Sequence, residues 1–348
     1  MNLSTLITPV IQAAILVNVM LIAAAYMVLA ERKVAAWIQN RIGPNRVGPW
    51  GLFQSFADVF KLYLKEDIVP AAADKTFHAM APVISIAVAI TAYAIIPWMD
   101  TVNIGGTDYT LSMAPNMDVA LLVMLAMTSV GVYGIALAGW SSNNKYSLMG
   151  GLRSTAQMIS YELSMGLSAV GVLMICGSLN LVDIIRYQME HGWNVFYQPL
   201  AFIIFLVTAL AETNRAPFDL PEAEPELVGG YHTEYASMKF GLLYLAEYAN
   251  ILASSAIMAV LFLGGWDLVP FVDEIALMGL APNSLPAVLI GHAALAGKAA
   301  LLVFVFIWIR WSLPRFRYDQ LMNLGWKVLL PLSLANITIT GIVLLLMK

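Results

Sequence analysis

Six carboxylic acids lie close together in one stretch of this chain, between two strongly apolar segments. The acids are Glu212, Asp219, Glu222, Glu224, Glu226 and Glu234. The stretch carries one base, Arg215, and three prolines that restrict its backbone and disfavour a regular helix. Carboxylates at this density influence one another's protonation where water is restricted. The chemistry predicted for this acidic loop, residues 213–238, is proton exchange, and the alternative is a solvated charged surface.

Three further charged residues fall inside apolar segments. Glu162 lies about a turn and a half into one segment, Glu247 is similarly placed in another, and Lys298 lies near the middle of a third. A lone charge at the centre of a bilayer costs about 2.5–3.5 kcal/mol and usually faces a partner or water. These residues are candidates for a proton relay, or alternatively for structural ion pairs. Glu31 and Glu212 close two apolar segments, where a solvated helix cap is the alternative.

The elements that carry these residues are long and apolar. Hydrophobic residues make up 60% and charged residues 11% of 348 positions, against roughly a quarter charged in soluble domains. Runs of about 17 to 24 apolar residues can cross a hydrocarbon core of about 30 Å. About eight runs are centred near residues 18, 88, 128, 166, 205, 251, 298 and 337, and the fifth, at 197–212, is the shortest. We expect an all-α polytopic membrane protein with a single integral membrane domain over residues 1–348.

Lysine and arginine are concentrated in alternate loops. The loops after the first, third, fifth and seventh runs hold most of the 18 bases, whereas the other side carries only Arg186 and Lys348. The positive-inside rule places the basic loops in the cytoplasm or its equivalent and both termini outside. The first run follows no basic n-region or cleavage site, so we expect a retained anchor. The outer loops, about 99–116, 177–196 and 264–285, are predicted to be connectors.

The first inner loop, residues 31–77, contains an element of a different kind. After a stretch interrupted by glycine and proline, apolar residues recur at offsets of one, three and four between polar ones. They are Leu52, Phe53, Phe56, Val59, Phe60, Tyr63 and Leu64. This pattern predicts an amphipathic helix at the membrane surface. The helix either anchors the bundle or borders an opening through which a lipid-soluble molecule enters.

The chain offers few ligands for a redox cofactor. Cys176 is its only cysteine, so it forms neither an internal disulfide nor an iron–sulfur site. The four histidines are scattered, and the topology places His191 outside and His232 inside, which disfavours a bis-histidine haem. We expect no cofactor bound by this chain. His232 is expected to be an exposed loop histidine, although it could titrate near neutral pH.

Three long strings resemble one known family. They are ERKVAAWIQNRIGPNRVGPWG (31–51), AETNRAPFDLPEAEPELVGGYHTEY (211–235) and PRFRYDQLMNLGWK (314–327). They closely resemble the quinone-site membrane subunit of proton-pumping NADH:quinone oxidoreductase, respiratory complex I. The likeness covers essentially the whole chain. The chain departs from the family's usual pattern at Pro225, where a small residue is common, and at Tyr231-His232, where a Phe-Asn pair is common.

The resemblance implies a position where the membrane arm meets the peripheral arm, in contact with other membrane-arm subunits and with quinone-proximal peripheral subunits. Ubiquinone or menaquinone is the implied substrate, and FMN and iron–sulfur clusters are implied in partner subunits. The implied quinone-chamber residues are Glu31, Arg32, Arg41, Arg46, Asp58, Arg310, Arg315 and Arg317. The implied proton-path residues are Glu162, Glu212, Arg215, Asp219, Glu222, Glu224, Glu226 and Glu247. The implied location is a bacterial plasma membrane or a mitochondrial inner membrane.

Three alternatives to this function stay open. A related membrane subunit of an energy-converting hydrogenase would share the fold and the acidic loop but would reduce no quinone. A stand-alone ion transporter is disfavoured because no internal repeat is evident and the large charged loops lie on one side. An assembly scaffold would leave Glu162, Glu247 and Lys298 unexplained.

Overall fold

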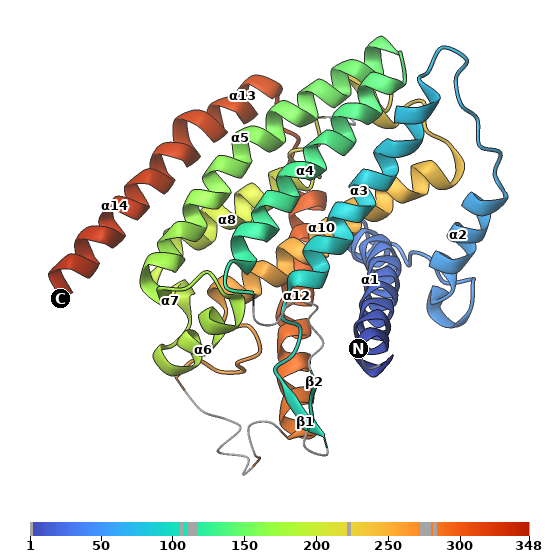
Figure 1. Ribbon diagram of the computed structural model, residues 1–348. Helices are drawn as coiled ribbons and strands as arrows, with labels where there is room; N and C mark the ends of the chain where they lie inside the picture. The colour runs from blue at the N-terminus through green and yellow to red at the C-terminus, as the bar shows by residue number, and fades with distance from the viewer. Residues whose placement is uncertain are drawn as a thin grey trace.

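The computed structural model describes the backbone of residues 3–104, 107–109, 117–220, 224–271, 280 and 284–347, and the side chains of 9–102, 117–220, 226–271, 280 and 284–347. Over these ranges the chain is a bundle of long helices joined by short segments (Figure 1). The long helices are α1 (Leu3–Ile38), α3 (Lys75–Ile95), α4 (Ala120–Ser141), α5 (Lys145–Cys176), α10 (Ser237–Phe262), α12 (Leu285–Ser312) and α14 (Leu330–Met347).

Shorter elements complete the fold. The helical ones are η1 (Pro49–Gly51), α2 (Gln54–Leu64), α6 (Leu181–His191), α7 (Asn194–Tyr197), α8 (Pro199–Glu212), α9 (Glu224–Leu227), η2 (Gly230–His232), α13 (Tyr318–Asn323) and the π-helical η3 (Leu324–Leu329). Strands β1 (Val102–Ile104) and β2 (Thr107–Tyr109) pair antiparallel, with Val102 opposite Tyr109. In Figure 1 this hairpin and the N-terminus lie at the lower side, while the turn between α4 and α5 lies at the upper side.

The membrane character expected from composition is confirmed. Seven helices of the described chain are long and apolar enough to cross a membrane, and the last runs continuously from α13 through α14. The predicted short fifth run forms α8, an apolar helix of 14 residues. The predicted surface helix forms α2, which packs on α1 and α10 and exposes Phe56, Phe60 and Tyr63.

The outer segment 177–196 is not a simple connector, contrary to the prediction. It folds into α6 and α7, and the Asn180 side chain caps α6 by accepting the backbone N–H of Val182. Leu181, Ile184, Ile185 and Gln188 are buried, and their spacing places them on one face of a helix. The glycine and asparagine content of this segment suggested a connector, but the apolar period inside it decides the structure.

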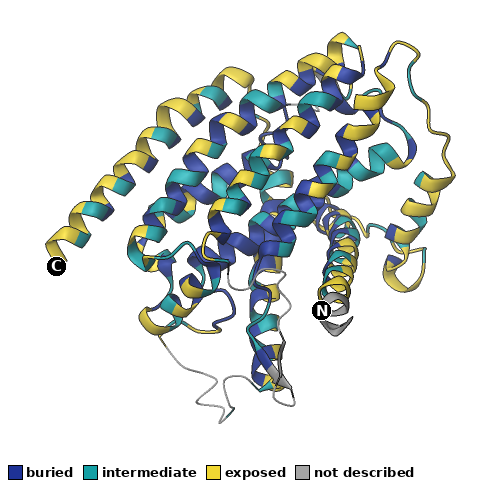
Figure 2. Ribbon diagram, in the orientation of Figure 1, coloured by how far each residue is buried: buried dark blue, intermediate teal, exposed yellow. Residues whose placement is uncertain are grey.

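Helix α10 lies at the centre of the bundle (Figure 2). It contacts α1, α2, α3, α8 and α12, and every residue from Ser255 to Phe262 is buried. Such an environment suits a helix that is apolar on all sides. Helix α14, in contrast, is mostly exposed along its length (Figure 2).

Gly150 allows η2 to lie directly on the backbone of α5. A Cβ atom at Gly150 would lie 2.7 Å from the Cα of Gly230 and 2.8 Å from the backbone nitrogen of Tyr231. Backbone atoms yield less easily than the end of a flexible side chain. The end of the acidic loop is therefore held at a fixed distance from α5.

Replacing Gly150 with alanine is expected to destabilise the protein by about 1–3 kcal/mol, because the added methyl group overpacks this contact. The measurement is the midpoint of thermal inactivation of the purified complex, which should fall by several degrees. Gly166→Ala on the same helix is the matched control, since no atom lies within 4 Å of its added Cβ. Equal midpoints for the two variants would contradict the proposed contact.

Candidate functional site

A cavity of about 350 Å³ lies at the end of the bundle that carries the basic loops, which we call the inner end. It lies between the end of α1, the segment that follows α8, and the facing parts of α10 and α12. Its lining residues are Glu31, Arg32, Ala35, Arg41, Pro44, Arg215, Tyr244, Tyr248, Arg310 and Trp311. Four of these are arginines, so the wall of this inner cavity is rich in hydrogen-bond donors.

Glu31 is buried in the wall of the inner cavity. Its side chain has contacts from two other helices, because Arg310 Nη1 contacts Oε1 and the Tyr248 hydroxyl donates to Oε2 at 2.7 Å. Only 6% of the residue is exposed. Glu31 is therefore not a solvated helix cap, and it contacts Arg310 directly.

A second ion pair lies beside the inner cavity. Arg32 Nη1 lies 2.5 Å from Asp58 Oδ2, and Gln54 donates to the other oxygen of Asp58 at 3.1 Å. These contacts join α1 to α2. Asp58 thus holds a cavity residue without lining the cavity itself.

Arg215 links the inner cavity to Glu247 in the interior. Its Nη2 lies 2.8 Å from Glu247 Oε2, and the side chains are only 4% and 9% exposed. Arg215 Cζ also lies 4.6 Å from the ring centroid of Tyr248 and 5.4 Å from that of Tyr244. Cation–π contacts of this kind are favourable in a desolvated site. The Tyr231 hydroxyl donates to Glu247 Oε1 at 2.6 Å.

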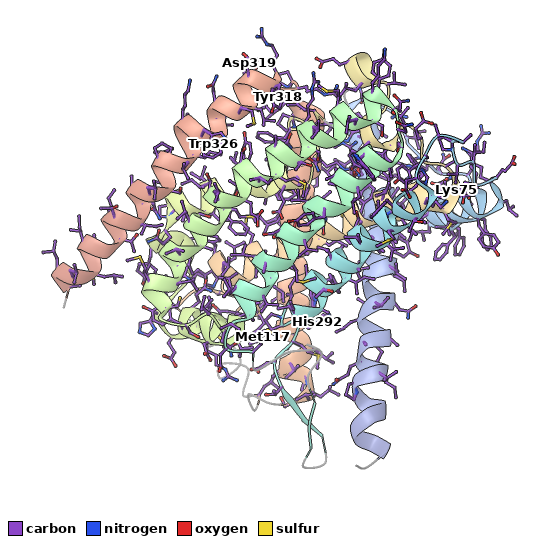
Figure 3. The ribbon with its side chains drawn as sticks, turned by 45° about the horizontal axis from the view of Figure 1, so that its top comes forward. Lys75, Met117, His292, Tyr318, Asp319 and Trp326 are labelled. Carbon is purple, nitrogen blue, oxygen red and sulfur yellow. The ribbon has the colours of Figure 1, made fainter. Side chains whose placement is uncertain are left out.

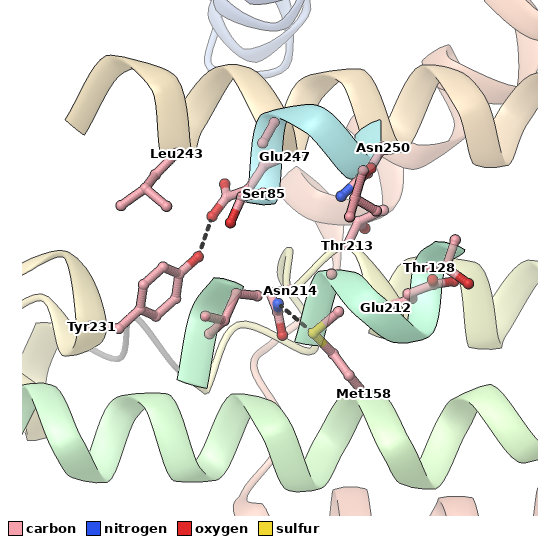
Figure 4. A pocket seen from close by; sticks show the side chains of 14 residues that line it. Ser85, Thr128, Met158, Glu212, Thr213, Asn214, Tyr231, Leu243, Glu247 and Asn250 are labelled. Carbon is pink, nitrogen blue, oxygen red and sulfur yellow. Dashed lines mark hydrogen bonds between the residues drawn. The ribbon is translucent and has the colours of Figure 1, made fainter. Parts of the chain in front are cut away.

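A smaller cavity of about 30 Å³ lies beyond Glu247 (Figure 4). Its polar lining residues are Ser85, Thr128, Glu212, Thr213, Asn214, Tyr231, Glu247 and Asn250. A polar cavity needs about 10–15 Å³ to hold one water molecule. This interior cavity therefore has room for water between Glu247 and Glu212.

Glu212 and Glu162 lie at the far side of the interior cavity. Glu212 shares a hydrogen bond with the Thr128 side chain and is close enough to Glu162 for electrostatic interaction. The Ser129 hydroxyl donates to Glu162 Oε1. Both residues are partly buried, and like charges that interact in restricted water disfavour ionising both carboxyls together. The Oε2 atom of Glu212 is buried without a hydrogen-bond partner among the described atoms.

The segment that carries Arg215 is fixed to α5. Gln157 donates to the backbone oxygens of Ala211 and Phe218 at 2.7 and 2.9 Å, and the Ser154 hydroxyl donates to Asn214 Oδ1 at 3.1 Å. These side chains satisfy a non-helical backbone that would otherwise be costly to bury. They hold Arg215 in place next to Glu247.

Two of the three sequence strings meet in space. Arg315 Nη2 lies 2.7 Å from Asp219 Oδ2, and the backbone nitrogen of Phe316 donates to the Pro217 oxygen at 3.1 Å. Arg315 therefore braces the acidic loop rather than the inner cavity. Arg46 and Arg317 do not line the inner cavity either, and Arg317 pairs with Asp319 on the surface at 3.1 Å.

The rest of the acidic loop is described only in part. Glu226 pairs with Arg153 at 2.7 Å and is 61% exposed, and Arg153 lies 5.9 Å from the ring centroid of Tyr318, which is labelled in Figure 3. Glu222 lies outside the described residues. The backbone of Glu224 begins α9, but its side chain also lies outside them.

The C-terminal end of the acidic loop is fixed to three helices. Asn144 donates to Glu234 Oε1 at 2.6 Å, and the Tyr235 ring stacks on His78 with centroids 4.1 Å apart. The Tyr235 hydroxyl also lies 3.4 Å from Ser141 Oγ. Burial raises the pKa of Tyr235 to about 12, so its hydroxyl stays protonated at neutral pH.

His232 is buried, and the expectation of an exposed loop histidine is wrong. Only 5% of the residue is exposed, and its ring packs against Tyr231 and Tyr244. Its Nε2 lies 3.7 Å from Glu247 Oε1. The loop folds back as η2 onto α5, which removes His232 from solvent.

Lys298 does not join the acids near the interior cavity. Its ammonium group donates to the backbone oxygens of Leu263 and Gly265 at 2.5 and 3.1 Å, and it also contacts the oxygen of Asp267. These residues follow the outer end of α10. The three charges predicted as one relay therefore lie in two separate places.

Several residues of the site were not predicted from the sequence. Tyr244 and Tyr248 line the inner cavity, and Thr128 and Ser129 bind the two interior carboxylates. The helical period could have revealed the tyrosines, because Tyr244 and Tyr248 are four residues apart and flank Glu247. Within the described residues, no three His, Cys, Asp or Glu side chains gather closely enough to hold a metal ion.

Comparison with known proteins places this chain in a family. The model of a family described as NADH dehydrogenase matches residues 11–341. A protein of Rhodothermus marinus described as the eighth subunit of NADH-quinone oxidoreductase is 51% identical over 337 residues, covering 95% of each chain. The chain belongs to this NADH-quinone oxidoreductase family. The H subunit of the Salinibacter ruber enzyme is 51% identical over 93% of this chain and 92% of its own, and that of Thermomicrobium roseum is 49% identical over 99% and 98%.

Membership in this family has direct consequences. The chain is a membrane subunit of NADH-quinone oxidoreductase, and its partners are other subunits of that complex. It is a multi-pass membrane protein, and its bacterial relatives place it in the plasma membrane.

Proposed function

We propose that this subunit forms much of the quinone-binding chamber of the complex and couples quinone reduction to proton translocation. One observation carries the proposal. An unbroken series of contacts leads from the inner cavity through Arg215 and Glu247 to the interior cavity, which Glu212 also lines. Arg215 therefore connects the inner cavity to Glu247, which lines the interior cavity together with Glu212.

The chemistry of the inner cavity supports quinone as its ligand. A quinone headgroup is flat and apolar and carries two carbonyl oxygens. Arg32, Arg41 and Arg310 supply hydrogen-bond donors to such oxygens, and Tyr244 and Trp311 supply aromatic surface. The volume of about 350 Å³ lies within the usual range of about 300–1,000 Å³ for small-molecule sites.

Coupling would follow from the charge that reduction creates. Two electrons from a partner subunit and two protons convert the quinone to quinol, and electron arrival adds negative charge in the inner cavity. Two unit charges 4 Å apart interact by about 4 kcal/mol in a partly screened site. Such an interaction would compete with Glu31 for Arg310 and with Glu247 for Arg215. The acidic residues from Asp219 to Glu226 would exchange protons with the groups of this path.

The related hydrogenase subunit remains the second candidate, because it would share the acidic loop. The names of the relatives favour quinone, since the proteins of Rhodothermus marinus, Salinibacter ruber and Thermomicrobium roseum are all described as subunits of NADH-quinone oxidoreductase. A lipid-soluble quinone also needs an opening toward lipid, and α2 exposes Phe56, Phe60 and Tyr63 beside α1.

Replacing Glu212 with glutamine tests the far end of the proposed path. We expect proton pumping per NADH oxidised to fall at least about fivefold, because a neutral amide cannot exchange a proton with the interior cavity. The measurement compares pumping with NADH oxidation in proteoliposomes that contain the whole complex. Glu190→Gln, on the exposed surface of α6, is the control and should leave both rates unchanged. Undiminished pumping in an assembled Glu212→Gln complex would remove Glu212 from the path.

A further inference from the structure

The outer end of α10 is buried together with its free carbonyl groups. An α-helix leaves its last four carbonyls without partners inside the helix, and partial negative charge gathers there. Val260, Leu261 and Phe262 are 0% exposed, so water does not cover these groups. A buried carbonyl without a partner costs about 1–3 kcal/mol.

Side chains of α6 and α7 donate hydrogen bonds to two of these carbonyls. Gln188 Nε2 donates to the Val260 oxygen at 2.8 Å, and Asn194 Nδ2 donates to the Leu261 oxygen at 2.9 Å. The Gln188 oxygen in turn accepts the backbone N–H groups of Asn194 and Gly264 at 3.1 and 3.0 Å. Both amide side chains are fully buried.

Lys298 of α12 binds the C-cap residue of α10 and the backbone that follows it. Its ammonium group has three N–H donors, and three backbone oxygens contact it, those of Leu263, Gly265 and Asp267. The ammonium nitrogen also lies 4.2 Å from the ring centroid of Trp193, whose Nε1 donates to Asp267 Oδ2 at 2.7 Å. A positive charge at a helix C-terminus opposes the partial charge of the helix.

The backbone here is shaped to bring these groups together. Gly264 and Gly265 have φ angles of 76° and 56°, which only glycine adopts readily. A Cβ atom at Gly264 would lie 2.5 Å from Trp193 Nε1. The chain therefore turns sharply around Trp193 and directs its carbonyls toward Lys298.

We propose that Lys298 is a fixed, positively charged cap of α10 and a positioning residue for Glu247, and not a member of a proton relay. Helix α10 is buried on all sides over its last eight residues, so a shift at its end moves the whole helix. Glu247 lies on the same helix, about 24 Å from Leu263 at 1.5 Å per residue. The effect on pumping rests on the proposed role of Glu247, whereas the capping itself does not.

Substitution by arginine separates a cap from a relay. Arginine keeps the positive charge and several donors but does not release its proton in a protein. We expect whole complexes with Lys298→Arg to keep the ratio of pumping to NADH oxidation within about twofold of the original. Lys298→Met should lower that ratio at least about fivefold. Hydrogen–deuterium exchange of the amides from 261 to 267 should rise about tenfold in the Met variant only.

Each outcome decides the proposal. An assembled Arg variant whose pumping falls to the level of the Met variant, with normal exchange at 261–267, would make Lys298 a relay and overturn it. Normal exchange in the Met variant would overturn it as well. If the Arg variant does not assemble, amide exchange at 261–267 in the Met variant decides the proposal, because loss of a mere relay residue would leave that exchange normal. Lys145→Met, at the exposed start of α5, is the matched control.

Failure of the proposed function gives a different result. Glu247→Gln with full pumping in the same vesicles would reject the proton path through Glu247. The exchange measurement at the end of α10 would still report on the cap.

Discussion

Glu247→Gln is expected to remove most proton pumping and to lower NADH-quinone turnover at least about tenfold, because the buried Arg215 loses its counter-ion. The Arg215–Glu247 pair is 2.8 Å long and nearly inaccessible to solvent. Removing one partner of a buried pair is destabilising by about 3–5 kcal/mol. Turnover, pumping and thermal stability are therefore measured together on the assembled complex.

A double variant separates stability from function. Arg215→Met/Glu247→Gln removes both charges, so it should recover much of the thermal stability lost in either single variant. Its pumping should stay as low as that of Glu247→Gln. Recovery of pumping along with stability would show that the pair is structural, as an ion pair without a role in proton transfer.

Arg310→Met is expected to raise the KM for quinone about tenfold with a smaller change in kcat, since the side chain supplies donors to the inner cavity and a partner to Glu31. Glu31 is 6% exposed and is contacted by Arg310 and by the Tyr248 hydroxyl. In the variant it would keep only the hydrogen bond from Tyr248. Arg310→Lys should restore part of the affinity, because lysine keeps the charge but not the planar donor geometry. Steady-state kinetics with a short-chain quinone measure both values.

The control for Arg310 is Arg186→Met on the outer side. Arg186 lies 3.7 Å from Asp100 and is 57% exposed, and exposed pairs contribute little to stability. The KM should not change in this variant. An unchanged KM in Arg310→Met as well would move the quinone site away from the inner cavity.

Much of the fold was predictable because apolar run length limits what a membrane helix can be. The short fifth run and the surface helix were both found, as α8 and α2. The outer segment containing α6 was not, because its length and its flanking glycines resemble a loop while its helical period spans only three turns. Local composition does not report the burial that stabilises so short a helix.

Lys298 and His232 show the limit for individual residues. The position of Lys298 within its own run was read correctly, near the middle of α12, but its function depends on how α10 ends beside it. His232 is polar and lies in a loop, yet a close approach between Gly150 and Gly230 buries it. Both outcomes depend on contacts between residues distant in sequence, which periodicity does not encode.

The shortness of α8 bears on how membrane voltage acts on this protein. Its 14 residues extend about 21 Å, against about 30 Å of hydrocarbon. If its outer end reaches the outer boundary, Glu212 lies about a third of the way into the membrane, inside the electric field. Moving one charge across the full field takes about 2.3 kcal/mol per 100 mV. A proton that enters from the inner side and crosses about a third of the field to reach Glu212 therefore takes about 0.8 kcal/mol per 100 mV. Protonation of this carboxylate from the inner side would then fall as the membrane potential rises. The potential that pumping generates would therefore slow further pumping.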